Sequence, residues 1–363
     1  MIMKKNSLIL LLFCFSFCNH AFAQTKKESL YSFIKNTVDS IYDKDKLPGV
    51  FAGILDNGER HFFNAGFADP EKQMPFDSAT VFEIGSITKT FTAYVLTAVL
   101  MENKIAETDP IIKYLPEAVQ KNQSLGSISF LSLMNHTSGL PRLPDNMKAA
   151  NSRQPYEDYS TTDLFAYLQG CTLKPDGKTN YSNLGAGIAG ILAERIAGRS
   201  YAALLDKYLL IPYKMQTTAL NDINANRNKS QGYFAKDDKT GYWNMNSLVA
   251  AGGIRSSAAD MLSYLQNMGA PKTTIAKQIT EKLTAQTIAL NPRIAIGRGW
   301  HIFNDNDKPV FYWHNGGTYG FSTFCAFTKD KSKAVIVVIN QFNKNGQADA
   351  LGASIIKKLI SEE

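Results

Sequence analysis

Three Ser-x-x-Lys segments draw attention first, because a serine hydroxyl and a lysine amine one helical turn apart can form a nucleophile and its base. They are Ser32 to Lys35, Ser86 to Lys89, and Ser354 to Lys357. The outer two fall on amphipathic terminal segments, where a lysine marks the solvent-exposed face. Ser86 instead follows Gly85 and leads into the apolar residues 91–100, so the sequence singles out Ser86 and Lys89.

Lys89 stands among apolar neighbours, and such surroundings disfavour its charge and lower its pKa. An uncharged amine can take the proton of the Ser86 hydroxyl, and a helix N-terminus favours developing negative charge. A serine at a helix start also serves as a simple cap, and this motif alone leaves both interpretations open.

A second element, Tyr-x-Asn, occurs as Tyr181-Ser182-Asn183 and as Tyr242-Trp243-Asn244. The first copy follows a turn at residues 175–177 and precedes a helix expected to start near Gly185. A loop in that place can direct both side chains into a cleft. A packed tyrosine and a helix-capping asparagine remain the alternative for this motif alone.

A third element has a basic residue two positions before a glycine. Literal Lys-x-Gly matches occur at Lys239-Thr240-Gly241 and Lys344-Asn345-Gly346, and both fall in polar turns. His314-Asn315-Gly316-Gly317 instead ends one predicted strand and leads into the next. Small residues at a strand edge allow a substrate backbone to approach and pair with it, although a single strand histidine more often has a structural role.

The elements that must position these residues alternate between helix and strand at both ends of the chain. Helical spacing is present at residues 29–42 and 349–360. Strands are predicted at residues 50–55 and 60–67, joined by an Asn57-Gly58 turn, and at 309–314, 321–327 and 334–339.

The middle of the chain has helical periodicity instead, at residues 88–102, 131–134, 161–168, 185–196, 202–210 and 258–268. The sequence therefore predicts an α+β fold in which an antiparallel sheet is flanked by N- and C-terminal helices. Residues 24–85 with 288–363 would form the sheet domain, and residues 86–287 an inserted all-helical domain. A site at their junction would match the usual place of pockets.

The first 23 residues are typical of an export signal, with Lys4 and Lys5 before a short apolar run and a cleavage site after Ala23. We therefore expect a periplasmic or secreted protein with no stable membrane span after cleavage. The net charge of +7 is spread thinly, and no basic stripe for nucleic acid is visible. Cys171 and Cys325 remain after cleavage, and two small buried residues explain them better than a disulfide.

Together the three elements resemble the penicillin-recognising serine hydrolases of class C β-lactamase type. The resemblance runs from about residue 51 to residue 360. Further similar segments are Tyr114-Leu115-Pro116, His136-Thr137-Ser138-Gly139-Leu140-Pro141, Gly252-Gly253 with Ser256-Ser257 and Asp260, and Gly299-Trp300. The resemblance favours Tyr181 over Tyr242, and His314 over Lys239.

The resemblance implies a role for each site residue. Ser86 would be the nucleophile, and Lys89 and Tyr181 would share the general-base role. Asn183 would hold the substrate's amide side chain, and His314 would bind a carboxylate or orient Tyr181.

Gly316 and Gly317 would lie against the substrate, and the backbone N–H of Gly317 would complete an oxyanion hole. No metal or cofactor is needed for this chemistry.

The resemblance implies hydrolysis of the β-lactam amide bond through an acyl-enzyme. Class C β-lactamases usually have lysine where this chain has His314, and a histidine is only partly charged at neutral pH. A D-alanyl-D-alanine carboxypeptidase or D-aminopeptidase acting on D-amino-acid peptides therefore remains an alternative. A small-acyl esterase and a non-catalytic penicillin-binding sensor are the further alternatives.

Overall fold

A computed structural model describes residues 27–173, 178–220, 228–329 and 332–362. The predicted export signal at residues 1–23 lies outside the described residues. Within the described ranges, no helix has both the length and the apolar composition that a membrane span requires.

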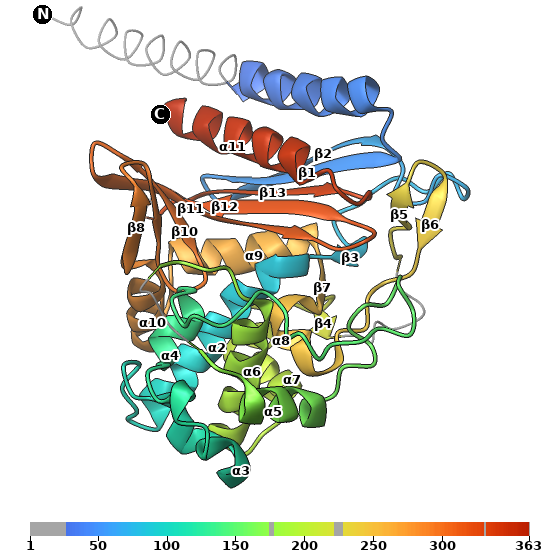
Figure 1. The fold of residues 1–363 in the computed structure, drawn as a ribbon. Helices are drawn as coiled ribbons and strands as arrows, with labels where there is room; N and C mark the ends of the chain where they lie inside the picture. The colour runs from blue at the N-terminus through green and yellow to red at the C-terminus, as the bar shows by residue number, and fades with distance from the viewer. Residues whose placement is uncertain (1–26, 174–177, 221–227, 330–331, 363) are drawn as a thin grey trace, which may run out of the picture.

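The largest element is an antiparallel sheet with the strand order β2-β1-β13-β12-β11-β10-β9-β8. Its strands are β1 Gly49–Asp56, β2 Glu59–Gly66, β8 Ile288–Asn291, β9 Ile294–Ile296, β10 His301–Asp305, β11 Lys308–Gly317, β12 Ser322–Phe327 and β13 Lys333–Ile339. Because β1 pairs with β13, the two ends of the chain complete one sheet (Figure 1).

Strand β13 shows how this sheet is covered on both faces. Val335 and Val337 pack in the cluster that contains the N-terminal helix, residues 27–45, and helix α11, Asn345–Ser361. Ile336 and Val338 belong to the core cluster that contains helix α9, Ala258–Gly269, on the opposite face (Figure 1). Since successive strand side chains point to opposite faces, burial on both faces explains the unbroken Val/Ile run.

The lower part of the molecule is mostly helical (Figure 1). Its α-helices are α2 Thr88–Glu102, α3 Glu117–Gln120, α4 Phe130–Met134, α5 Thr161–Gly170, α6 Asn183–Ala197, α7 Tyr201–Leu205, α8 Val249–Gly252, α9 Ala258–Gly269 and α10 Thr274–Thr284. Shorter turns of 3₁₀ or π type are η1 Gly85–Ile87, η2 Ile111–Tyr114, η3 Gln123–Leu125, η4 Asp206–Leu210 and η5 Asn246–Leu248. Helix α2 is buried on all sides over residues 88–100, which accounts for its apolar sequence.

The predicted α+β class is confirmed. The middle of the chain also contains short strands that the helical periodicity did not indicate. They are β4 Ala219–Leu220, β5 Gly232–Ala235, β6 Asp238–Thr240 and β7 Ile254–Ser257, and β7 pairs with β3 Val81–Glu83. Residues 86–287 are therefore not wholly helical, and the domain boundaries at 86 and 287 stay a prediction.

Two smaller expectations are confirmed. Asn57 and Gly58 both have positive φ, 51° and 90°, and form the predicted hairpin turn between β1 and β2. Cys171 and Cys325 are free thiols, as expected; Cys325 is buried, whereas Cys171 is only partly buried, so the expected burial holds for Cys325 alone.

Candidate active site

Ser86 lies in the 3₁₀ turn η1, which joins β3 to the N-terminus of α2. The preceding Gly85 has a φ of +51°, and a Cβ there would lie 2.7 Å from the backbone nitrogen of Gly317. Glycine is therefore required for the turn that carries Ser86 to press against the end of β11.

Lys89 follows one turn later and is 3 % exposed. Its Nζ lies 3.0 Å from Ser86 Oγ and donates to the backbone oxygen of Ala251 at 2.7 Å. Burial, and then the nearby charge of Arg142, hold the pKa of Lys89 well below 10.5. An uncharged amine at this distance can accept the hydroxyl proton of Ser86.

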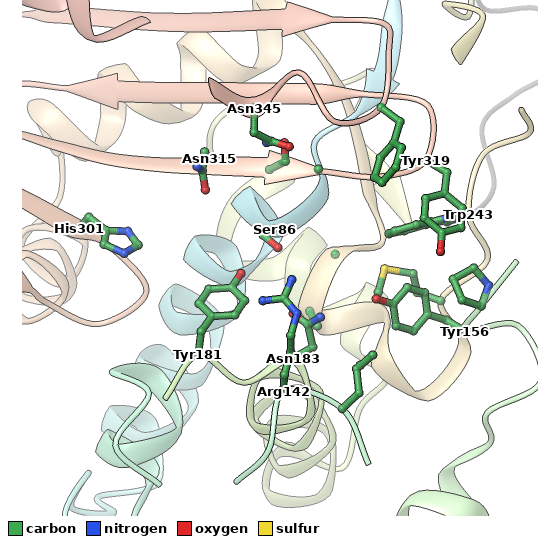
Figure 2. Close-up of a pocket in the computed structure, with 18 of the residues that line it drawn as sticks. Ser86, Arg142, Tyr156, Tyr181, Asn183, Trp243, His301, Asn315, Tyr319 and Asn345 are labelled. Carbon is green, nitrogen blue, oxygen red and sulfur yellow. The ribbon is translucent and has the colours of Figure 1, made fainter. Parts of the chain in front are cut away.

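Tyr181 also approaches Ser86, and a side-chain hydrogen bond joins the two residues. Figure 2 shows the Tyr181 side chain next to Ser86. The Nζ of Lys89 lies 4.8 Å from the centre of the Tyr181 ring. Burial raises the pKa of Tyr181 to about 12, although the hydrogen bond to Ser86 and the charge of Arg142 act against this rise. Tyr181 is thus a protonated phenol that can donate a proton near Ser86.

The loop at residues 136–141 holds Tyr181 in place. The His136 ring lies 4.5 Å from the Tyr181 ring, and its Nδ1 accepts the backbone N–H of Ser182 at 3.3 Å. The Ser182 hydroxyl donates to Pro141 O at 2.6 Å and caps helix α6 by accepting the N–H of Gly185. Because burial lowers the pKa of His136 to about 3, its ring stays neutral and can accept.

Asn183 is the first residue of α6 and is buried at the pocket wall. Its backbone N–H donates to Arg142 O at 3.0 Å, and its side chain is hydrogen-bonded to Tyr156. The side-chain amide is therefore held in place at the pocket wall.

His314 lies in β11 but is not among the residues that line the pocket. It is 1 % exposed, its Nδ1 lies 2.6 Å from Asn315 O, and its ring lies 5.3 Å from the His301 ring. Burial is the main cause that holds the pKa of His314 well below 6.5. His314 is therefore an uncharged ring behind the wall to which Gly316 and Gly317 contribute.

The pocket has a volume of about 570 Å³ and opens between the end of β11 and the N-terminal end of α6. It is lined by Ser86, Arg142, Leu143, Pro155, Tyr156, Tyr181, Asn183, Trp243, Met245, Ala251, Gly252, His301, Trp313, Asn315, Gly316, Gly317, Tyr319, Phe342 and Asn345. Figure 2 shows Ser86 at its centre, with Tyr181 on one side and the aromatic group of Tyr156, Trp243 and Tyr319 on the other.

The competing motifs are placed elsewhere. Lys35 bonds Asp39 on the surface, and Lys357 lies over the Phe303 ring. The Tyr242 hydroxyl donates to the backbone oxygens of Val81 and Ser230, which is a structural role. Lys239 forms an ion pair with Glu71.

Sequence reasoning missed several pocket residues. Asn345 belongs to a Lys-Asn-Gly segment regarded as a polar turn, yet its Nδ2 donates to Gly316 O at 2.7 Å. Arg142 directly follows the similar segment at 136–141, and that adjacency was the available signal. Tyr156 and Tyr319 come from loops far apart in the chain, and no local pattern identifies them.

Comparisons with known proteins agree with this geometry. A sequence model of the Beta-lactamase family matches residues 34–359. A Beta-lactamase from Escherichia coli (strain K12) is 26 % identical over 357 residues, covering 86 % of this chain and 89 % of that protein. A Beta-lactamase from Pseudomonas fluorescens is 27 % identical over 349 residues, covering 86 % and 94 %.

Solved structures give the same result. A class C beta-lactamase superposes with a TM-score of 0.77 at 26 % identity, covering 91 % of this chain and 96 % of that chain. A mutant form of a class C beta-lactamase superposes with a TM-score of 0.79 at 24 % identity, covering 92 % and 98 %, which shows the shared fold. The match over most of its length makes this chain a member of the Beta-lactamase family, and hence a serine hydrolase of β-lactamase-like type.

Proposed function

We propose that this chain is an exported, class C-like serine β-lactamase that hydrolyses the amide bond of β-lactams through an acyl-enzyme on Ser86. One observation carries the proposal: the buried amine of Lys89 lies 3.0 Å from Ser86 Oγ, with a low pKa and no carboxylate bonded to it in the described residues. The hydrogen bond between Ser86 and Tyr181 places a protonated phenol beside the same serine.

In the acylation step, Ser86 Oγ forms a bond to the lactam carbonyl carbon while Lys89 takes its proton. The carbon–nitrogen bond then breaks, and Tyr181 gives a proton to the leaving nitrogen and is reprotonated from Lys89. The backbone N–H groups of Ser86 and Gly317 would stabilise the oxyanion, at roughly 3 kcal/mol per donor. The close approach of Gly85 to Gly317 supports this pairing.

In the deacylation step, water attacks the ester carbon on Ser86. The amine and phenol beside the ester can remove the proton of this water and return it to Ser86 Oγ. This step regenerates the enzyme and releases the opened lactam. Asn183 would hold the side-chain amide of the substrate in both steps.

The proposed export rests on Lys4, Lys5 and the apolar run that follows them. A periplasmic or secreted location would place the enzyme where β-lactams and cell-wall peptides are found.

A second candidate is a peptidase that acts on D-amino-acid peptides. The uncharged, buried state of His314 favours it, because the part of β11 that lines the pocket then lacks a cation to anchor the carboxylate of a penicillin. Release of D-Ala from a bisacyl D-Ala-D-Ala peptide, together with a long-lived penicillin adduct, would favour the peptidase.

Hydrolysis of a chromogenic cephalosporin by the purified protein tests the first proposal, with Ser86→Ala as control. Mass spectra taken at intervals after brief penicillin exposure report the modified residue and the deacylation rate. Turnover no faster than that of the control would reject the β-lactamase, and a label on another residue would reject Ser86 as nucleophile.

A further inference from the structure

We propose that Arg142 selects substrates whose acyl side chain carries a carboxylate or similar anion. This proposal rests on the acyl-serine function proposed for the same pocket. It names the class of substrate that the pocket prefers.

The backbone of Arg142 is fixed next to the reacting groups. Its carbonyl oxygen accepts the N–H groups of Asn183 and Leu184, at 3.0 and 3.3 Å. The guanidinium carbon lies 5.1 Å from the centre of the Tyr181 ring. Figure 2 shows the guanidinium between Tyr181 and Asn183, directed toward Ser86.

Within the described part of the chain, the guanidinium of Arg142 has no ion pair and no hydrogen-bond partner. Other arginines are occupied: Arg298 pairs with Glu107, Arg153 pairs with Asp238, and Arg195 donates to a backbone oxygen. The pocket lining contains no aspartate or glutamate, and Arg142 is its charged side chain. This cation is therefore available to a ligand.

A guanidinium stacked on an aromatic ring keeps its edge N–H groups free for other partners. These parallel donors match the two oxygens of a carboxylate and bind it in bidentate fashion. Arg142 is solvent-exposed at the pocket rim, so such a contact depends on this bidentate geometry more than on exclusion of water.

The position of Arg142 indicates which part of the substrate it contacts. It lies beside Asn183, which we propose holds the side-chain amide, and it lies across Ser86 from β11 (Figure 2). A group attached just beyond that amide is within its reach. The adjacent aromatic wall of Tyr156, Trp243 and Tyr319 would contact the apolar remainder.

Three penicillins with the same nucleus and phenyl ring provide the test: benzylpenicillin, carbenicillin with an added α-carboxylate, and ampicillin with an α-ammonium. We expect the second-order rate constant of acylation to be highest for carbenicillin and lowest for ampicillin. The carbenicillin-to-benzylpenicillin ratio should be about tenfold or more. All three share the nucleus carboxylate, so the ratio isolates the side chain.

Arg142→Gln should remove most of this ratio, and Arg142→Lys should retain part of it because the charge remains. Arg199→Gln is the control, because Arg199 is exposed at the end of α6, lies outside the pocket and carries the same charge. The control should keep the wild-type ratio.

Equal rates for the three penicillins in the wild type would overturn the inference. So would an Arg142→Gln variant that slows all three by one factor, since Arg142 would then bind the shared carboxylate. If penicillins do not acylate the protein, the same ratio is measured with 4-nitrophenyl hemisuccinate against 4-nitrophenyl butyrate. No Ser86-dependent reaction with either series would overturn the proposed function and, with it, the inference.

Discussion

Two buried lysines occupy opposite situations in this molecule. Lys333 begins β13 with a side chain 4 % exposed and forms an ion pair with Asp56, the residue opposite it on β1. Lys89, equally buried beside Ser86, has a hydroxyl and a backbone oxygen as its neighbours. The paired amine joins two strands, whereas the amine without a carboxylate has a depressed pKa.

The difference follows from desolvation. Burying an ammonium costs several kcal/mol unless an opposite charge compensates it. Without such a charge, burial favours the neutral amine and lowers the pKa of the lysine. A lysine of the first kind contributes to structure, and one of the second kind becomes a base at neutral pH. The four predictions below test this contrast.

The largest effect is expected for Lys89→Met. Loss of the amine should slow acylation of Ser86 by about 10²- to 10⁴-fold. Because the cost of burying a protonatable amine also disappears, thermal unfolding should occur at a higher temperature than in the wild type. Stopped-flow acylation and differential scanning calorimetry measure the two effects, and a variant that is both active and less stable would contradict the contrast.

Lys333→Met should have the opposite effect. It leaves the Asp56 carboxylate buried without its partner, which costs about 3–5 kcal/mol of unfolding free energy. Acylation per folded molecule should remain as in the wild type. The double variant Asp56→Leu/Lys333→Met should recover most of the loss in denaturant unfolding, and a single variant as stable as the double would refute the pairing argument.

Glu83 extends the contrast to an acid. Burial raises the pKa of this carboxyl from 4.5 to about 7, despite hydrogen bonds from Thr318 and the Trp243 N–H. The protonated Glu83 side chain stabilises the fold. This stabilisation is fully present below pH 4.5 and is lost as the pH rises through 7. The unfolding free energy of Glu83→Gln, relative to that of the wild type, should therefore increase by roughly 3 kcal/mol between pH 4.5 and pH 8. Denaturant unfolding of both proteins at each pH measures this difference. The same difference in unfolding free energy at pH 4.5 and at pH 8 would contradict the prediction.

The smallest effect is a shift of the pH profile. The charge of Arg142 helps to lower the pKa of Lys89, so Arg142→Gln should raise it. The rate of acylation increases as Lys89 loses its proton, and the acid limb of the profile should move to higher pH. The pH dependence of acylation is measured with benzylpenicillin. An acid limb that stays in place or moves to lower pH would show that Arg142 does not lower the pKa of Lys89.

Of the two buried lysines, the sequence predicted the state of Lys89 but not the ion pair of Lys333. The apolar residues 91–100 predicted a depressed Lys89 pKa, and the helical spacing of residues 88–102 predicted helix α2 with the bounds that the structure has. Lys333 gave no signal, because its partner Asp56 is distant in the chain and meets it through strand register.

Other misses have similar causes. Strands β8 to β10 were not predicted, and β8 is largely exposed at the edge of the sheet, where little apolar alternation is required. Strands of two to four residues, such as β4 and β7, are too short to show a period. Ser86 and Tyr181 were found through motifs, whereas Arg142 and Tyr319 reach the pocket through tertiary structure.

The central claim is that burial without a carboxylate partner lowers the pKa of Lys89 beside Ser86 far below that of an ordinary lysine. Titration of the ¹³Cε resonance of Lys89, assigned with the Lys89→Met variant, tests it most directly. The account predicts a pKa well below 10.5. A Lys89 that stays protonated up to about pH 10, near the ordinary value for lysine, would contradict it.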